Sequence, residues 1–288
     1  MSVKHLLLVL FVPLLLIPEL ANAQKKANPL IYNFEPEEYG AHNQTWEITQ
    51  TRKGHIAVAT GSGIVIFDGE EFEMVRGEPA MITDLITTSD GSTYYGANNI
   101  LGQIVEDSDG FLHYHSLTDE IDTDYRDFGT VWNLLEYGNE ILVPTRESLF
   151  RYSGEHFEVT TPIENTFFRA YDVDGSVFIS EIDTSLLLYK GNGELEPVPG
   201  GDELTGDLTP YFIIPYDDTR LLIGTIRDGL FLFYTEQYND VPEGTLEPFP
   251  NEINEQLAEG NAGKGIELTN GYFAISTLTS GVFIINRE

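Results

Sequence analysis

The feature that most constrains the fold of this 288-residue chain is a pattern that recurs six times. In each copy an apolar run ends in a polar turn, a second apolar run ends in a small or polar residue, and a third run follows after a short loop. A period of roughly 20 to 50 residues is typical of repeat architectures. The copies begin at Thr45, Thr83, Thr130, Phe168, Tyr211 and Gly265.

The spacing of the copies favours one repeat architecture. A fourth, more polar run such as EFEMV or HFEVT closes the earlier copies, and four short strands in roughly 40 residues make one propeller blade. A β-sandwich would also alternate in hydropathy, but it would not repeat one plan six times in phase. The sequence therefore predicts an all-β protein, a β-propeller with about six four-stranded blades. The second runs of the copies end at Thr60, Ala97, Thr145, Glu181, Thr225 and Thr277.

The last copy stops after its third run, which leaves the closure of the propeller open between two alternatives. In the first, PLIYNF (Pro29 to Phe34) supplies the missing outer strand of the sixth blade through Leu30 to Phe34. One terminus then completes the blade begun by the other and protects its edge. In the second, the chain is the front part of a truncated seven-bladed propeller. We expect an N-terminal segment at 24–44 and the propeller at 45–288.

The N-terminus predicts export. Lys4 gives a short basic start, an apolar core runs from Leu6 to Ile17, and Ala21-Asn22-Ala23 is a small-x-small cleavage site. We expect a signal peptide at 1–23, cleavage between Ala23 and Gln24, and a periplasmic or extracellular protein without a transmembrane span after signal removal. The alternative is an uncleaved membrane anchor, against which the short, interrupted apolar core argues.

Charge and cysteine content narrow the partners. The chain has 15 Lys and Arg residues against 47 Asp and Glu residues, a formal net charge of −32, and no Cys. An acidic surface of this kind repels nucleic acid and anionic membranes. Without Cys there are no disulfides, and the mature chain is long enough to bury a core without them.

The units resemble the repeats of two-component regulator propellers, the exported sensor regions of hybrid histidine kinases and related regulators of Bacteroidetes-type bacteria. The matching stretches are ITQTRKGHIAVATGSGIVIFDG, IIPYDDTRLLIGTIRDGLFLFY and the opening PLIYNFEPEEYGAHNQTWEI. The resemblance covers essentially the whole mature chain. It implies a sensor region that acts through a downstream module or a homodimer partner, with any kinase activity in a region absent from this chain.

Several motifs that suggest chemistry are better explained as turns. GSGIVIFDG lacks the third glycine and the helix of a dinucleotide loop. Gly200 to Leu204 (GGDEL) lacks the surrounding α/β domain of a cyclase, and the acidic turns that begin at Asp107 and Asp172 lack the glutamate of a calcium loop. His113 and His115 share a strand face without a third ligand. We therefore predict no catalytic residue, no metal site and no cofactor.

Ligand binding is expected instead at the rim formed by the loops between second and third strands and between blades. Aromatic, Arg and amide side chains there suit a sugar or another polar ligand, whereas Trp46 and Trp132 are expected in the core. The predicted ligand-binding residues are Tyr39, His42, Asn98, Asn99, Tyr125, Arg126, Arg146, Asp183 and Arg227.

The sequence thus predicts an exported, non-enzymatic sensor propeller that binds a small molecule or oligosaccharide. Two other classes stay open: a propeller enzyme of the lyase or glycosidase type, and a platform for protein–protein interaction. An enzyme would need clustered acids, histidines or metal ligands on the channel face, and the sequence alone does not reveal such a cluster.

Overall fold

The computed structural model describes residues 32–77, 81–237, 241–260, 262–269 and 271–287. The chain divides into two units, Met1–Glu35 and Pro36–Glu288, and every described strand lies in the second. The predicted signal peptide and its Ala23–Gln24 cleavage site lie outside the described residues. No helix in the described part of the chain is long and apolar enough to cross a membrane. The described helical elements are α2 (Pro36–Tyr39), α3 (Asn254–Gly260), η2 (Thr118–Glu120), η3 (Thr123–Tyr125), η4 (Gly201–Glu203) and η5 (Gly206–Leu208).

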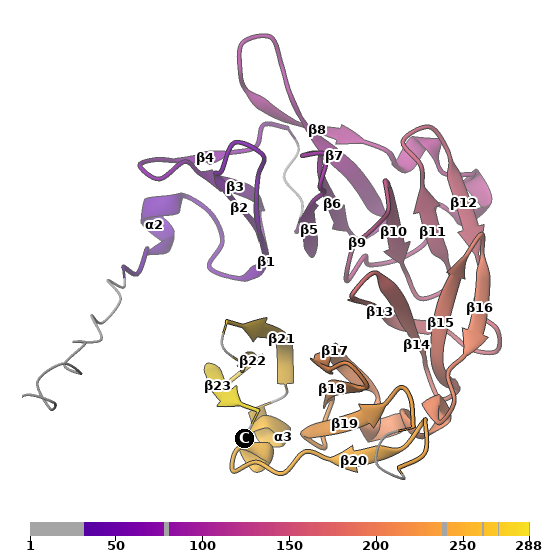
Figure 1. Cartoon of the computed structure of the whole chain (residues 1–288). Coiled ribbons are helices and arrows are strands. Elements are labelled where there is room, and N and C mark those ends of the chain that lie inside the picture. The colour runs from indigo at the N-terminus through magenta and orange to yellow at the C-terminus, as the bar shows by residue number, and fades with distance from the viewer. Residues whose placement is uncertain (1–31, 78–80, 238–240, 261, 270, 288) are drawn as a thin grey trace, which may run out of the picture. The chain divides into compact units, whose positions relative to one another are not determined.

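The second unit consists of six antiparallel sheets, one for each repeat, each with its strands in chain order (Figure 1). Blade 1 contains β1 (Thr45–Gln50), β2 (Ile56–Thr60), β3 (Gly63–Phe67) and β4 (Phe72–Met74). Blade 2 contains β5 (Asp84–Thr87), β6 (Thr93–Ala97), β7 (Ile100–Glu106) and β8 (Leu112–Ser116). Blade 3 contains β9 (Leu135–Tyr137), β10 (Glu140–Pro144), β11 (Leu149–Tyr152) and β12 (Phe157–Thr160).

The last three sheets continue this plan, and the sixth has three strands. Blade 4 contains β13 (Phe167–Val173), β14 (Ser176–Glu181), β15 (Ser185–Gly191) and β16 (Glu194–Pro197). Blade 5 contains β17 (Pro210–Asp217), β18 (Arg220–Thr225), β19 (Leu230–Tyr234) and β20 (Leu246–Pro248). Blade 6 contains β21 (Ala262–Leu268), β22 (Tyr272–Thr277) and β23 (Val282–Asn286).

The predicted six-bladed β-propeller is confirmed, including the second-strand ends to within one residue. The sequence pattern did not reveal α3, which lies in the connection between blades 5 and 6. The candidate closing strand at Leu30–Phe34 falls partly outside the described residues, and residues 32–34 are not in a strand. This closing role stays a prediction.

The glycine-rich stretch at Gly61–Gly63 is the turn between β2 and β3. Thr60 pairs with Gly63 across the two strands, and the Thr60 hydroxyl donates a hydrogen bond to the Gly63 carbonyl. Gly63 has φ of 128°, which disfavours a side chain at this position. The stretch therefore serves as a hairpin and not as a phosphate loop.

Apolar side chains fill the space between each blade and the next. Five separate clusters of buried residues occupy the five spaces between consecutive blades. Burying one large apolar side chain contributes about 1.5–3 kcal/mol, so these clusters supply most of the stabilisation. Fully buried members, in blade order, are Ile64, Phe150, Ile179, Phe233 and Phe273.

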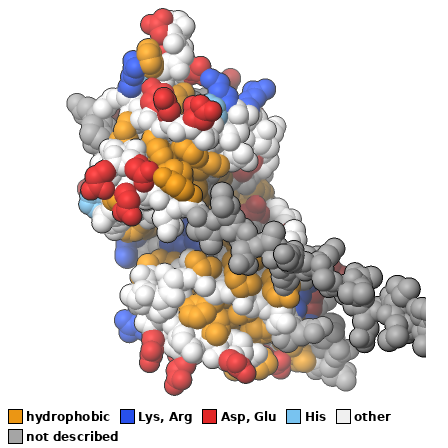
Figure 2. All heavy atoms as spheres, turned by 90° about the vertical axis from the view of Figure 1, so that its left-hand side faces the viewer, with side chains coloured by type: hydrophobic (Ala, Val, Ile, Leu, Met, Phe, Trp, Pro, Cys, Tyr) orange, Lys and Arg blue, Asp and Glu red, His pale blue; other side chains and the backbone are white. Residues whose placement is uncertain are grey.

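Blades 1 and 6 each expose an apolar face. On β1, the Thr49 hydroxyl accepts a hydrogen bond from the Thr87 backbone of blade 2, so the neighbouring Ile48 lies on the opposite face and is 62% exposed. On β23, Phe283 packs against the apolar cluster between blades 5 and 6, whereas Val282 and Ile284 are exposed. Figure 2 views the molecule from the side on which blades 1 and 6 lie. It shows two groups of hydrophobic side chains with Lys and Arg side chains between them.

Candidate functional site

The inner strands of all six blades line one cavity of about 320 Å³ on the propeller axis. This volume lies at the lower end of ligand pockets, roughly 300–1,000 Å³. Each blade contributes two or three consecutive residues of its inner strand, and in blade 3 two of the three lie just before the strand. Those with polar or aromatic side chains are Glu47, Thr49, Asp84, Asn133, Arg169, Tyr171, Tyr211, Phe212 and Lys264.

A β-bulge near the start of the inner strand recurs in blades 1, 4, 5 and 6. The register shifts at Trp46, at Phe168 and at Tyr211, and again between Ala262 and Gly265. A bulge adds one unpaired residue and redirects the side chains beside it. These bulges therefore place an aromatic residue next to a cavity-lining residue in blades 1 and 4.

Aromatic rings gather at this end of the inner strands. The Trp46 and Trp132 ring centroids lie 5.8 Å apart, and those of Phe168 and Tyr211 lie 6.1 Å apart. Trp46 is partly buried as expected, but Trp132 is 39% exposed, so its predicted place in the core is wrong. Trp132 directly precedes Asn133, which lines the cavity, and it is not part of the apolar cluster between blades 2 and 3.

Four ionisable side chains line the axial cavity, two acidic and two basic. Lys264 on blade 6 forms an ion pair with Glu47 on blade 1, which joins the last blade to the first. The Lys264 ammonium nitrogen also lies 4.0 Å from Asp84 Oδ1 on blade 2. Arg169 comes from β13 of blade 4.

Asp84 is the most deeply buried of these four groups. Its Oδ2 accepts a hydrogen bond of 2.5 Å from the Leu134 backbone N–H of blade 3. Burial raises the pKa of Asp84 to about 8, although the Leu134 hydrogen bond and the Arg169 charge act in the opposite direction. At neutral pH this carboxyl group is mostly protonated and is a hydrogen-bond donor beside the cavity.

The position of Arg169 is restricted by an aromatic ring and by a hydrogen bond to the backbone of the next residue. Its guanidinium carbon lies 4.4 Å from the centre of the Tyr211 ring, which is a cation–π arrangement. The Asn133 side-chain amide donates a hydrogen bond of 2.8 Å to the carbonyl of Ala170, the next residue. Arg169 Nε is buried without a hydrogen-bond partner, as is Trp46 Nε1. Within the described ranges, no acidic group forms an ion pair with Arg169.

The rim residues predicted from the sequence pair with neighbouring loops. The Asn99 side chain donates to Asp127 Oδ1 at 2.9 Å and accepts from the Gly129 backbone, and Thr130 donates to Asn98. Arg227 lies 3.8 Å from Asp207. The loops between second and third strands therefore lie beside the connections between blades.

The other predicted residues have local roles or exposed side chains. His42 accepts a hydrogen bond from the Gln44 backbone and packs on Gly61. Arg126 donates to the carbonyls of Asp119 and Ile121, and Tyr39 packs edge-on against Phe72. The side chains of the last three, Tyr125, Arg146 and Asp183, are exposed. None of the nine predicted residues lines the axial cavity, so their ligand-binding role stays a prediction.

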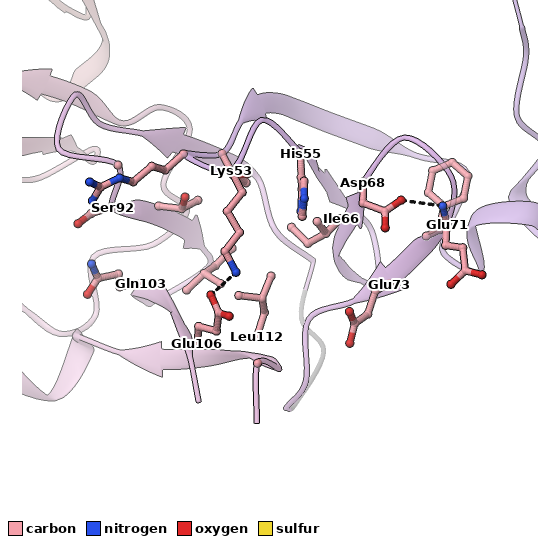
Figure 3. Close-up of a pocket in the computed structure, with 17 residues that line it drawn as sticks. Lys53, His55, Ile66, Asp68, Glu71, Glu73, Ser92, Gln103, Glu106 and Leu112 are labelled. Atoms are coloured by element: carbon pink, nitrogen blue, oxygen red, sulfur yellow. Dashed lines mark hydrogen bonds and ion pairs between the residues drawn. The ribbon is translucent and has the colours of Figure 1, made fainter. Parts of the chain in front are cut away.

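A second cavity of about 540 Å³ lies between blades 1 and 2 (Figure 3). It is near the turns that join the first and second strands of these blades, around Lys53 and Gly91. Its charged side chains are largely engaged by the fold. Lys53 forms an ion pair of 2.5 Å with Glu106, and Asp68 accepts the backbone N–H groups of Glu70 and Glu71.

Each cavity is lined by a residue with a buried polar atom that lacks a hydrogen-bond partner, Thr51 Oγ1 in the second cavity and Arg169 Nε on the axis. The axial cavity is the better candidate site because all six blades contribute to it and its arginine forms no ion pair with an acid among the described residues.

The remaining motifs form local turns. Asp107 accepts hydrogen bonds from the Asp109 and Phe111 backbones, and Asp172 accepts one from Gly175, as in ordinary Asx turns. His113 Nε2 contacts Asp107 Oδ2 at 2.7 Å. Gly200–Leu204 lies in the connection between blades 4 and 5. Within its described ranges, the structure contains no group of three or more His, Asp or Glu residues that could hold a metal ion.

The fold and the axial cavity define a six-bladed β-propeller with a charged and aromatic site on its axis. No family model matches the sequence, and no curated protein matches it. The extracellular domain of a protein described as a hybrid two-component system from B. thetaiotaomicron shares the fold, with a TM-score of 0.64 and 16% identity. That match covers 90% of this chain and 33% of that one, so this chain spans about a third of its length.

Propeller enzymes share the fold as well. A catalytically inactive virginiamycin B lyase from Staphylococcus aureus matches with a TM-score of 0.56 and 13% identity over 85% of both chains. A gluconolactonase from Xanthomonas campestris matches with a TM-score of 0.52 and 10% identity, over 86% of this chain and 87% of that one. At these identities the likeness establishes the fold, and it leaves activity to be argued from the site.

Proposed function

We propose that this chain is an exported, non-enzymatic sensor propeller that binds a small ligand in the axial cavity. The observation that carries the proposal is the convergence of all six inner strands on one cavity with charged and aromatic side chains. The similarity to an extracellular domain of a two-component system supports a sensor role outside the cytoplasm.

The geometry suggests how binding would be transmitted. Residues that line the cavity also hold neighbouring blades together: Asp84 joins blades 2 and 3, Asn133 joins blades 3 and 4, and Lys264 joins blades 6 and 1. A ligand that prefers one arrangement of these contacts shifts the population of blade arrangements. Such a shift would reach a downstream module or a second copy of the chain.

An enzyme is the second candidate, and the acids Glu47 and Asp84 are the observation that favours it. Both line the cavity, and propeller lyases and lactonases share the fold. Glu47 is neutralised by Lys264, and Asp84 accepts the Leu134 backbone N–H. These contacts support positioning roles for the two acids.

The test is a thermal-shift screen of the purified chain with small saccharides and organic acids, followed by chromatography of each stabilising compound. A sensor is expected to be stabilised, because a ligand that binds only the folded state raises its stability, and to return the compound unchanged. Conversion of the compound, lost in Asp84→Asn and Glu47→Gln, would support the enzyme. The absence of any stabilising compound in either class would contradict the proposal.

A further inference from the structure

The charges in the axial cavity do not balance at neutral pH. Glu47 and Lys264 neutralise each other as an ion pair, because Lys264 keeps most of its charge at neutral pH although burial lowers its pKa to about 8. The pKa of about 8 leaves Asp84 mostly uncharged. Arg169 stays ionised, since a guanidinium group does not lose its proton in proteins. One positive charge in the cavity therefore lacks a negative partner, in a chain whose net charge is −32.

The surroundings of Arg169 make this lack of a partner costly. Its Nε atom is buried without a hydrogen bond, and a buried donor that loses water without gaining an acceptor destabilises the folded state. Among the described residues, neither carboxylic acid of the cavity accepts a hydrogen bond from Arg169 Nε: Glu47 forms its ion pair with Lys264, and Asp84 Oδ2 accepts the Leu134 N–H. An acceptor that arrives with a ligand would remove this cost.

The guanidinium group is also oriented before any ligand arrives. The Tyr211 ring lies 4.4 Å from its central carbon, and the Asn133–Ala170 hydrogen bond fixes the adjacent backbone. A planar fork of donors held in one orientation matches the two oxygens of a carboxylate. Prior orientation reduces the entropy lost when such a pair forms.

We propose that the axial cavity binds a small carboxylate, with Arg169 as its anchor and Tyr211 as an apolar wall. This inference rests on the proposed function and names the ligand class of the same cavity. Among the described residues that line the cavity, Arg169 is the one cation outside an ion pair, and Glu47 and Asp84 line the same space, so a monoanion is balanced better than a doubly charged phosphate. The Trp46–Trp132 pair, one residue nearer the rim, would contact the part of a ligand that extends out of the cavity.

Two sources of the carboxylate fit the volume of about 320 Å³, an acidic sugar and a simple organic acid. Calorimetry on the purified chain separates them with D-glucuronate, its neutral methyl ester, benzoate and inorganic phosphate as probes. D-Glucuronate, benzoate or both are expected to bind at least tenfold more tightly than the ester and phosphate. Because the ester comparison uses the unaltered protein, it does not depend on the folding of any variant.

Arg169→Gln and Arg169→Lys then test the anchor. We expect Arg169→Gln to weaken carboxylate binding at least tenfold and Arg169→Lys to weaken it less, because lysine keeps the charge and loses the fork. Arg76→Gln is the matched control and is expected to bind normally, because Arg76 also stacks on an aromatic ring, that of Phe111, but is exposed and lies outside the axial cavity. Equal binding by wild type and by Arg169→Gln that melts like wild type would overturn the inference.

The outcomes also separate this inference from the proposed function. Binding of neutral saccharides without binding of carboxylates would refute the carboxylate class and leave the sensor proposal intact. Tighter binding of phosphate than of either carboxylate would refute it in favour of a phosphorylated ligand. Failure of every probe and of the wider saccharide and acid screen would contradict both proposals.

Discussion

Lys264, on the inner strand of the last blade, forms an ion pair with Glu47, on the inner strand of the first. Glu47 is largely buried, whereas about half of the Lys264 side chain is exposed. The pair joins blades whose other facing surfaces carry the exposed apolar residues Ile48, Val282 and Ile284. The contact between the two ends of the propeller therefore includes a specific electrostatic link at its axis.

Removing either partner of this link is expected to destabilise the propeller. Lys264→Gln and Glu47→Gln should each lower the free energy of unfolding in urea by about 1 kcal/mol, because one charge loses its partner. The double variant should lose less than the sum of the two. The control is Lys190→Gln, which removes an exposed pair with Glu196 and should change little. Additive losses would show that the pair is not coupled.

Asp84 is expected to make stability depend on pH. Its folded pKa of about 8 lies above the ordinary value of 3.8, so the folded state retains the proton between these values. Its contribution is therefore full below about pH 4 and is lost as the pH rises towards 8. The groups that face Asp84 are Lys264, Arg169 and the Leu134 N–H.

Asp84→Asn keeps a neutral side chain at every pH and should remove this dependence. Relative to wild type, its free energy of unfolding should rise by up to a few kcal/mol between pH 5 and pH 7.5. Urea titrations at several pH values measure the difference. A difference that stays constant over this range would show that the Asp84 carboxyl group is ionised in the folded protein.

The blade plan could be predicted from the sequence because each strand end carries its own local signal. Small or polar residues such as Thr60, Thr225 and Thr277 end the second strands, and their hydroxyls cap the following turns. The axial site could not be assembled in this way. Its members Glu47, Asp84, Arg169 and Lys264 are far apart in the chain and converge only when the blades pack.

One signal for the axial site was nevertheless present in the repeats. Glu47 is the third residue of the first copy, and Asp84 and Arg169 are the second residues of the second and fourth copies. In the structure the three residues have equivalent register positions, opposite Ala59, Gly96 and Ser180 of the second strands, and all three line the axial cavity. The bulges that direct these side chains depend on strand register, which the sequence pattern does not specify.

Tyr171 is expected to be a strong link between blades 4 and 5. Its hydroxyl donates a hydrogen bond of 2.6 Å to the Pro210 carbonyl and lies 3.1 Å from Ser180 Oγ, both in buried surroundings. Tyr171→Phe should lower the free energy of unfolding by about 1–3 kcal/mol, because the buried carbonyl loses its donor. Tyr125→Phe, at a 39% exposed ring, is the control. A loss no larger than in the control would contradict this role.

The open edge of β23 bears on the predicted closing strand. Five blades have four strands and the sixth has three, so β23 is an edge in the described structure. If Leu30 to Phe34 closes the sixth blade, deletion of residues 24–34 should lower the melting temperature by several degrees and speed amide exchange in β23. Unchanged melting and exchange would contradict that closure.

The central claim is that a ligand binds on the propeller axis, and tryptophan fluorescence tests it most directly. The chain has two Trp residues, Trp46 and Trp132, whose ring centroids lie 5.8 Å apart, and each directly precedes a residue that lines the cavity. Titration with D-glucuronate or benzoate should change the emission saturably, with the same dissociation constant as calorimetry, and Arg169→Gln should move the titration to at least tenfold higher concentration. Calorimetric binding without any change in emission would place the ligand elsewhere and contradict the account.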